Sequence, residues 1–209
     1  GTGASPASSM RYAGIAPEIG LSETQQTLIL NGLRGQVRLQ TDGQLKTGHD
    51  VISMALLGAE EFAFGTTALI VLGCVMMRKC HTNTCPVGVA TQDPKLRAHF
   101  RGHYEYVVNY FRFLAQEVRE YLAEMGFRRL DDIVGRTDLI ELKEAPHGTK
   151  ASLLNFSRLL HQVGNGNALH NISEQKHDIG NVLDVNIIAA AKEAIERQKE
   201  ISLEYAIAN

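Results

Sequence analysis

Apolar side chains recur every three or four residues along one long stretch of the chain, residues 104–125. This spacing places them on one face of a helix, with charged residues lying between them. Gly126 follows directly and is suited to end the helix. The stretch therefore predicts an amphipathic helix whose apolar stripe consists of Val107, Phe111, Leu114, Val118, Leu122 and Met125.

Weaker helical patterns cover residues 21–33, 51–57, 130–140 and 183–199. Ser22 is a candidate N-cap for the first of them, and Gln25 stands three residues later, in the capping-box position. Thr47 or Asp50 is placed to cap the second, which Gly58 closes. The third pattern predicts one or two short helices.

Alternation of apolar and polar residues predicts two short strands, residues 37–41 and 61–64. Glycine turns follow both strands, at Gly43 and Gly65. With the helix predicted between them, these strands form a βαβ unit, in which the strands run parallel. Residues 201–207 also alternate and predict a third strand, for which the chain offers no partner.

The remaining segments set the organisation of the chain. Residues 1–20 are rich in Gly, Ser, Ala and Pro and predict a loop. Residues 141–181 lack periodicity and hold four of the eight histidines, which predicts an irregular connection. We therefore expect an α/β domain over residues 1–140, a connection over 141–181 and the start of another domain over 182–209.

The composition excludes several classes of protein. Hydrophobic residues make up 44% and charged residues 21%, values that exclude global disorder. The formal net charge of -2 gives no strong field toward nucleic acid or an anionic membrane. Residues 62–77, the longest uncharged apolar stretch, are too short and too interrupted to span a bilayer, and the first residues carry no signal peptide. Neither nucleic acid nor a membrane is expected as a partner.

The cysteines Cys74, Cys80 and Cys85 all fall within 12 residues. An odd, tightly clustered set argues against a secreted disulfide framework and for a reducing compartment. Three thiolates on one loop can hold three irons of an iron–sulfur cluster, and Pro86 after the last cysteine is typical of ferredoxin loops. Because a four-iron cube normally needs a fourth ligand, a 3Fe-4S cluster fits this set better.

Spacing alone leaves two other states of these thiols open. Zinc held by the three cysteines and His81 is an ordinary structural combination, and it stands equal to iron on this evidence. Such a site would make the chain a zinc-stabilised, non-catalytic interaction module. Unligated thiols are a third state, which explains Cys74 as a small buried hydrophobe but not the whole set.

The two glycine turns are candidates for a phosphate site, because backbone amides and Thr hydroxyls in such turns donate hydrogen bonds to anions. They are Asp42-Gly43-Gln44 and Gly65-Thr66-Thr67. Both follow the carboxyl end of a predicted strand, where α/β proteins bind ligands. Glycine and threonine are also common in ordinary βα connections, and each motif taken alone favours that simpler explanation.

Five segments together resemble the glutamate synthase family, in its large chain. They are residues 1–6 (GTGASP), 41–48 (TDGQLKTG), 56–62 (LLGAEEF), 74–78 (CVMMR) and 85–92 (CPVGVATQ). The resemblance runs from residue 1 to about residue 138 and resumes at residue 183. It implies a partial (β/α)8 TIM barrel that holds the last strands and helices of the FMN-binding synthase domain, followed by the start of a β-helix domain.

The resemblance also implies cofactors and a reaction. The residues around the FMN phosphate would be Asp42, Gly43, Gln44, Gly65, Thr66 and Thr67. Cys74, Cys80 and Cys85 match the family's ligands of a 3Fe-4S cluster, which favours iron over zinc. The family forms L-glutamate from 2-oxoglutarate and ammonia released from glutamine, with FMN delivering the hydride and the cluster relaying electrons. These electrons come from an NADPH-dependent flavoprotein small subunit or from ferredoxin.

Other parts of the family's large chain are missing from this sequence, namely the amidotransferase domain and the first barrel strands. No catalytic acid or base is therefore assigned, and we expect this piece alone to be inactive because its strand edges stay open. The expected location is the cytoplasm, or the plastid in a photosynthetic eukaryote. FMN-dependent 2-hydroxyacid oxidases share a similar Asp-Gly turn but need no cysteine cluster, so they fit this sequence less well.

Overall fold

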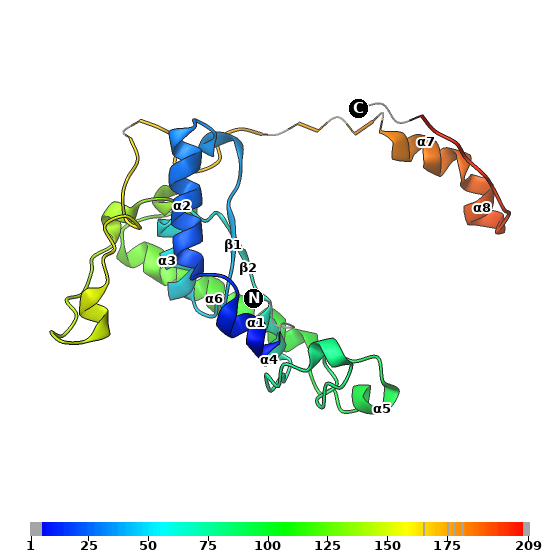
Figure 1. Cartoon of the computed structure of the whole chain (residues 1–209), viewed down its shortest axis with the longest axis horizontal. Coiled ribbons are helices and arrows are strands. Elements are labelled where there is room, and N and C mark those ends of the chain that lie inside the picture. Colours follow the sequence, from blue (N-terminus) through cyan, green and yellow to red (C-terminus); the bar gives the residue numbers. More distant parts are fainter. Residues whose placement is uncertain (1–5, 165, 175, 178, 181, 207–209) are drawn as a thin grey trace. The chain divides into compact units, whose positions relative to one another are not determined.

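Figure 1 shows the chain in a computed structural model, which describes residues 6–164, 166–174, 176–177, 179–180 and 182–206. The chain forms two compact units, Gly1–Ser173 and Glu174–Asn209. The first unit contains both glycine turns and the three cysteines. The Gly-rich start of the chain, residues 1–5, lies outside the described residues.

The first unit combines helices with a small sheet, which confirms the α/β class. Its α-helices are α1 Ala7–Tyr12, α2 Pro17–Leu30, α3 Gly48–Leu56, α4 Thr66–Val71, α5 Pro94–Arg97 and α6 Tyr104–Glu124. Its strands are β1 Gln40–Asp42 and β2 Glu61–Ala63. Its 3-10 turns are η1 Arg34–Gln36, η2 Cys80–Thr82, η3 Leu130–Ile133, η4 Thr137–Leu139 and η5 Lys150–Leu153. The long helix α6 and the two short turns after it confirm their predictions.

The strands β1 and β2 pair in parallel, with Thr41 opposite Phe62 and Asp42 opposite Ala63. Because α3 lies between them in the chain, the predicted βαβ unit is confirmed. β1 begins at Gln40, three residues later than the alternation predicts. Among the described residues these are the two strands, and the eight-stranded barrel and the β-helix stay predictions.

The core lies where α2, α3 and α6 cover the short sheet. α3 packs against α6, and α2 packs beside β1 (Figure 1). One buried cluster joins Leu21, Leu45, Met54, Leu57 and Ala59. A second cluster joins Ile52, Ala55, Leu56, Leu122 and Ile133. α3 therefore contributes buried side chains to both clusters.

Residues 6–20 form more regular structure than predicted. α1 occupies residues 7–12, and α2 begins at Pro17 instead of residue 21. A proline at the first helical position suits a helix start, because its φ angle is already helical and its missing N–H would have no partner there. The N-cap prediction for Ser22 is wrong, since Ser22 lies inside α2 and its Oγ donates to the Leu159 carbonyl at 2.5 Å.

The described residues between 141 and 173 are irregular, as predicted, except for the 3-10 turn η5. It is nevertheless part of the first unit. Leu159 and Leu160 pack against the core, and Gln25 of α2 donates through Nε2 to the Leu169 carbonyl at 2.8 Å. Side chains of α2 thus hold this segment by its backbone carbonyls.

The second unit contains two short helices, α7 Leu183–Ala190 and α8 Lys192–Arg197. The single helix predicted for residues 183–199 is therefore divided at Ala191. Residues 201–206 form no strand, so the prediction of a strand there is wrong, while Ile207 lies outside the described residues. No described segment pairs with them, and a strand needs a partner for its backbone groups. None of the helices in the described ranges is long and apolar enough to cross a membrane.

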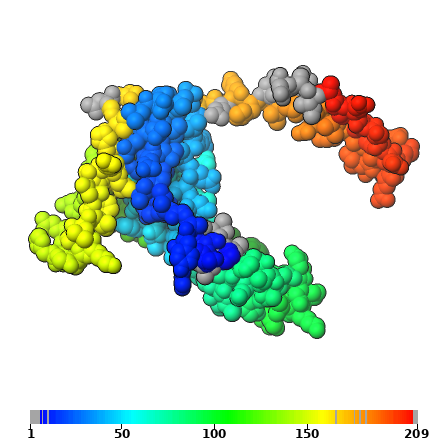
Figure 2. Space-filling model, viewed as in Figure 1, coloured from blue at the N-terminus to red at the C-terminus, as the bar shows by residue number. Residues whose placement is uncertain are grey.

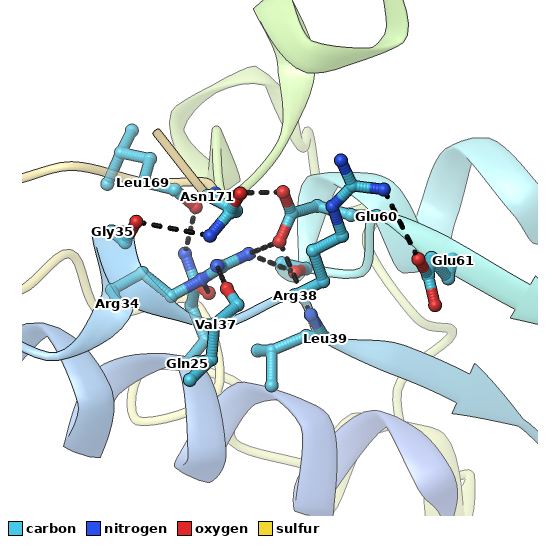
Figure 3. Close-up of polar contacts among 11 residues, drawn as sticks. Gln25, Arg34, Gly35, Val37, Arg38, Leu39, Glu60, Glu61, Leu169 and Asn171 are labelled. Carbon is cyan, nitrogen blue, oxygen red and sulfur yellow. Dashed lines mark hydrogen bonds and ion pairs between the residues drawn. The ribbon is translucent and has the colours of Figure 1, made fainter. Parts of the chain in front are cut away.

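A buried ion pair between Arg34 and Glu60 connects four segments of the first unit (Figure 3). The Arg34 side chain is 1% exposed, and its Nη2 lies 2.5 Å from Glu60 Oε2. Its Nε donates to Gln25 Oε1. Nη1 donates to the Val37 carbonyl at 2.7 Å, and Nη2 also donates to the Gly58 carbonyl at 3.1 Å. The guanidinium therefore has acceptors on several sides.

Both oxygens of the Glu60 carboxylate also accept hydrogen bonds. Oε2 also accepts from the Leu39 amide at 3.3 Å, and Oε1 accepts from the Asn171 amide at 2.8 Å. Leu39 leads into β1 and Glu60 directly precedes β2, so the pair fixes the start of both strands. It also holds the segment around Asn171 against them.

We expect Glu60→Ala to lower the free energy of unfolding by about 3–5 kcal/mol, because Arg34 would keep its buried charge without a counter-ion. The neighbouring variant Glu61→Ala is the matched control. It removes an exposed pair with Arg38, 3.6 Å apart, and should cost less than about 1 kcal/mol. Urea unfolding of both variants measures the difference, and equal losses would contradict the role given to the buried pair.

Candidate functional site

Both glycine turns lie at the same end of the sheet. The parallel register places Asp42 beside Ala63, so the turns leave β1 and β2 next to each other. Gly43 has a φ angle of +149°, and Gln44 has one of +66°, in the left-handed region. Gly65 caps the start of α4. The structure thus brings together the two segments that the sequence selects as a phosphate site.

Thr67 links the two turns directly. Its Oγ1 donates to the Leu45 carbonyl at 2.6 Å, and its side chain is buried. Thr67 therefore joins the turn after β1 to the start of α4, while Asp42 and Gln44 are exposed.

The turn after β1 leads into α3 through a capping box of Thr47 and Asp50, the two residues that the sequence offers as alternative caps. Thr47 is the N-cap, and its Oγ1 accepts from the Asp50 amide at 3.2 Å. Asp50 Oδ2 in return accepts from the amides of Lys46 and Thr47 at 2.8 and 3.0 Å. Burial alone would raise the pKa of Asp50, but these hydrogen bonds and the nearby His49 together hold it below its usual value.

Helix α6 supplies two side chains to the same turn. The Tyr110 hydroxyl donates to the Lys46 carbonyl, and Glu117 Oε2 accepts from the Gly48 amide at 2.6 Å. Burial raises the pKa of Tyr110, and the negative charges of Glu117 and Asp50 raise it further. A hydrogen bond with Thr67 acts in the opposite direction but does not offset them. Sequence reasoning missed both α6 residues, because a contact 64 or 69 positions away in the chain leaves no local pattern.

The three cysteines line one small cavity. The part of the chain that carries them, coloured between cyan and green, lies at the surface of the first unit in Figure 2. Cys85 is buried, and Cys74 and Cys80 are half-buried. The other lining residues are Val75, Met76, Met77, Arg78, Lys79, Pro86 and Val87. His81 is exposed and lies outside this lining. His81, the fourth ligand in the zinc hypothesis, is therefore not among the residues that line the cavity.

Left-handed backbone turns shape this loop. Met76, Arg78 and Asn83 have φ angles of +57°, +54° and +59°, which are uncommon for residues with a side chain. Asn83 also closes the base of the loop, because its Oδ1 accepts from the Gln92 amide at 2.7 Å and from Thr91 Oγ1 at 3.1 Å. These bonds close residues 83–92, which contain Cys85, into a loop.

The backbone of residues 87–90 lies close to the Cys85 thiol. Burial alone would raise the pKa of the thiol, but hydrogen bonds from the backbone of Ala90, Val87, Val89 and Gly88 together lower it. The thiolate is the form that binds metals, so these donors favour a ligand state. The Met76 amide donates in the same way to Cys74 Sγ at 3.4 Å.

The soft sulfur donors and the amides around them suit iron or zinc better than a hard cation. In the part of the chain that the structure describes, however, no three His, Cys, Asp or Glu side chains are close enough to hold one ion together. The cysteines share a cavity without forming a complete ligand set.

A protein-family model matches the part of the chain that contains the two glycine turns and the three cysteines. The model of the conserved region in glutamate synthase matches residues 1–128. The chain belongs to the glutamate synthase family. The match includes β1, β2, α6 and all three cysteines.

Relatives match the chain over nearly its whole length. It is 52% identical to the glutamate synthase (NADPH) large chain of Bacillus subtilis, over 100% of this chain and 14% of that protein. It is 49% identical to the glutamate synthase (NADH) of Schizosaccharomyces pombe, over 94% of this chain and 9% of that protein. It is 48% identical to the ferredoxin-dependent, chloroplastic glutamate synthase of Oryza sativa, over 100% of this chain and 13% of that protein. The chain thus spans about a tenth to a seventh of these relatives.

We expect Asp50→Asn to lower the free energy of unfolding at pH 7 by about 1 kcal/mol, because the amide accepts the two N–H bonds less strongly than the carboxylate. The folded-state pKa lies below the unfolded value of about 3.9. The stabilisation is therefore fully present above that value and is lost as the pH falls through the folded pKa.

Urea unfolding of both proteins between pH 7 and pH 3 tests this expectation. The difference between them should shrink at the acid end. Asp184→Asn, in the exposed first turn of α7, is the control and should change stability far less. A difference that stays constant down to pH 3 would contradict the assigned role of the Asp50 charge.

Proposed function

We propose that this chain is the part of a glutamate synthase large chain that holds a 3Fe-4S cluster and one side of an FMN site. The observation that carries the proposal is the shared cavity of Cys74, Cys80 and Cys85, in a chain of this family. The proposed overall reaction forms L-glutamate from 2-oxoglutarate and ammonia released from glutamine. Because the chain spans a small share of its relatives, the reaction is proposed for a complete large chain and not for this piece alone.

Cys74, Cys80 and Cys85 would hold the cluster as thiolates. When bound, the cluster would supply one-electron transfer between an external donor and the flavin. The backbone amides around Cys85 favour its thiolate and would donate hydrogen bonds to sulfur, which tunes the potential of such sites. Met76 and Val87 line the same cavity and make its wall apolar.

The two turns after β1 and β2 would hold FMN, which would supply hydride transfer when bound. We assign the backbone of Gly43 and Gln44 and the start of α4 at Gly65 and Thr66 to the phosphate side. Thr67 acts through its bond to the Leu45 carbonyl, which holds the two turns together. Because a carboxylate repels a phosphate, the exposed Asp42 is better suited to the hydroxyl donors of the flavin's ribityl chain.

The proposed partners are the rest of the large chain and an electron donor. The relatives are named for NADPH, NADH or ferredoxin, and both kinds of donor fit the proposal. The remaining barrel strands would pair with the open edges of β1 and β2. The proposed location is the cytoplasm, or a plastid as the names of the plant relatives indicate for those proteins.

Replacing one thiolate tests the cluster. In a full-length large chain that contains this sequence, Cys80→Ser should remove most of the bound iron and acid-labile sulfide together with glutamate formation, because a hydroxyl replaces a thiolate ligand. His81→Asn, an exposed change in the same loop outside the cavity lining, is the control and should keep both. Zinc in place of iron, or unchanged iron in the serine variant, would contradict the proposal.

A methyl group at Gly65 tests the flavin side. Its φ angle is -107°, and no heavy atom lies within 4 Å of the position that a Cβ would take. Gly65→Ala should therefore fold normally but weaken FMN binding by about tenfold, since the methyl group would occupy space open to the phosphate. Gly20→Ala in α2, where a Cβ also meets nothing within 4 Å, is the matched control.

Flavin fluorescence titration of a deflavinated, full-length large chain measures both dissociation constants. Equal FMN affinity in the Gly65→Ala and Gly20→Ala variants would argue against a phosphate at this turn.

A further inference from the structure

The backbone between Leu45 and Gly48 is held from outside at three points. The Leu45 carbonyl accepts from Thr67 of α4, the Lys46 carbonyl accepts from Tyr110 of α6, and the Gly48 amide donates to Glu117 of α6. These bonds come from two helices that follow β2 in the chain. The segment that leaves the first glycine turn is therefore fixed by contacts distant in sequence.

Packing limits the movement of the same segment. The Leu45 side chain is 3% exposed and belongs to the core cluster of α2 and α3. At Gly48 a Cβ would lie 2.9 Å from the Glu117 side chain and from the Val118 backbone nitrogen. α6 thus touches the start of α3 so closely that only glycine fits there.

Gly43 and Gln44 connect this fixed segment to β1. The strand holds them on one side through the pairing of Asp42 with Ala63, and Leu45 holds them on the other. Gln44 adopts a φ angle of +66°, which a residue with a Cβ keeps only when its surroundings impose it. Loss of an anchor beyond Leu45 would release this conformation.

We propose that Tyr110 and Glu117 are positioning residues that hold the turn of Gly43 and Gln44 in the conformation that binds the flavin phosphate. The inference rests on the proposed function, which puts FMN at this turn. Neither side chain is proposed to touch the flavin. Both act through the backbone of residues 46–48.

Tyr110 donates a hydrogen bond and Glu117 accepts one, so different substitutions should change FMN binding in different ways. Tyr110→Phe keeps the ring, including its edge contact with Phe111 at 5.5 Å, and removes only the hydroxyl that holds the Lys46 carbonyl. Glu117→Gln keeps an oxygen that accepts from the Gly48 amide, and it removes a negative charge that disfavours a nearby phosphate. Glu117→Ala removes the acceptor as well as the charge.

The test compares FMN with riboflavin, which lacks the phosphate. Dissociation constants of both flavins are measured by fluorescence titration of a deflavinated, full-length large chain that contains this sequence. Tyr110→Phe and Glu117→Ala should weaken FMN binding by about five- to tenfold, the effect of one hydrogen bond, and should change riboflavin binding by less than about twofold. Glu117→Gln should bind FMN at least as tightly as the unchanged protein.

Tyr104→Phe and Glu124→Gln are the matched controls, because both side chains are exposed and lie on the same helix. Both should leave the two constants unchanged. Iron content and thermal unfolding show that each variant is folded, and where Tyr110→Phe does not fold, the two Glu117 variants give the same comparison.

The outcomes separate this inference from the proposed function. One outcome is that the unchanged protein binds FMN more tightly than riboflavin, and that the variants Tyr110→Phe and Glu117→Ala keep this preference in full. The proposed flavin site would then stand, while the positioning role would be wrong. An equal loss of FMN and riboflavin binding also overturns it, because it indicates a general disturbance of the fold. If the unchanged protein binds both flavins equally, the phosphate is not held at this turn and the proposed flavin site is wrong.

Discussion

The buried pair of Arg34 and Glu60 is the interaction on which the arrangement of the first unit depends. Charges of this kind are costly to bury, and they are tolerated only when every polar atom around them has a partner. Here the partners are supplied by α2, by the backbone before β1, by the turn after α3 and by the segment near Asn171. The four segments must therefore assemble together, since withdrawing any one leaves a buried charge incompletely satisfied.

The position of this pair explains why the other end of the sheet is available for a site. Glu60 accepts from the Leu39 amide, and the Leu39 carbonyl in turn accepts from the amides of Glu60 and Glu61. All of these bonds lie at the amino ends of β1 and β2. The carboxyl ends are left to the glycine turns, which is the division between stability and ligand binding seen in parallel β/α proteins. The two-stranded sheet thus has one end that carries the buried pair and another end that is left to the candidate site.

The sequence predicted those features whose cause is local. The stripe of α6, the helix cap at Thr47 and the parallel βαβ unit all follow from spacing within a few residues. Ser22 has the residue type of an N-cap, but Pro17 starts the helix earlier and the distant Leu159 carbonyl takes the Ser22 hydroxyl. Arg34, Tyr110 and Glu117 were missed for the same physical reason, because their partners are brought near only by the fold. The cysteines were found because they lie on one short loop, and their shared cavity needs little more than that loop to turn.

The two halves of the proposed site are therefore held by different means. The cysteine loop relies on its own backbone, through left-handed residues and the backbone near Cys85 that lowers the pKa of its thiol. The turn after β1 relies on side chains from α4 and α6, which reach it across the core. Backbone donors are present whatever the side chain, so substitutions near the cysteines that spare the thiols and the turns should be well tolerated. A contact made by a single hydroxyl or carboxylate is lost when that side chain is replaced. A substitution on the far helix α6 can for this reason disturb the flavin side of the site while the cluster side keeps its geometry.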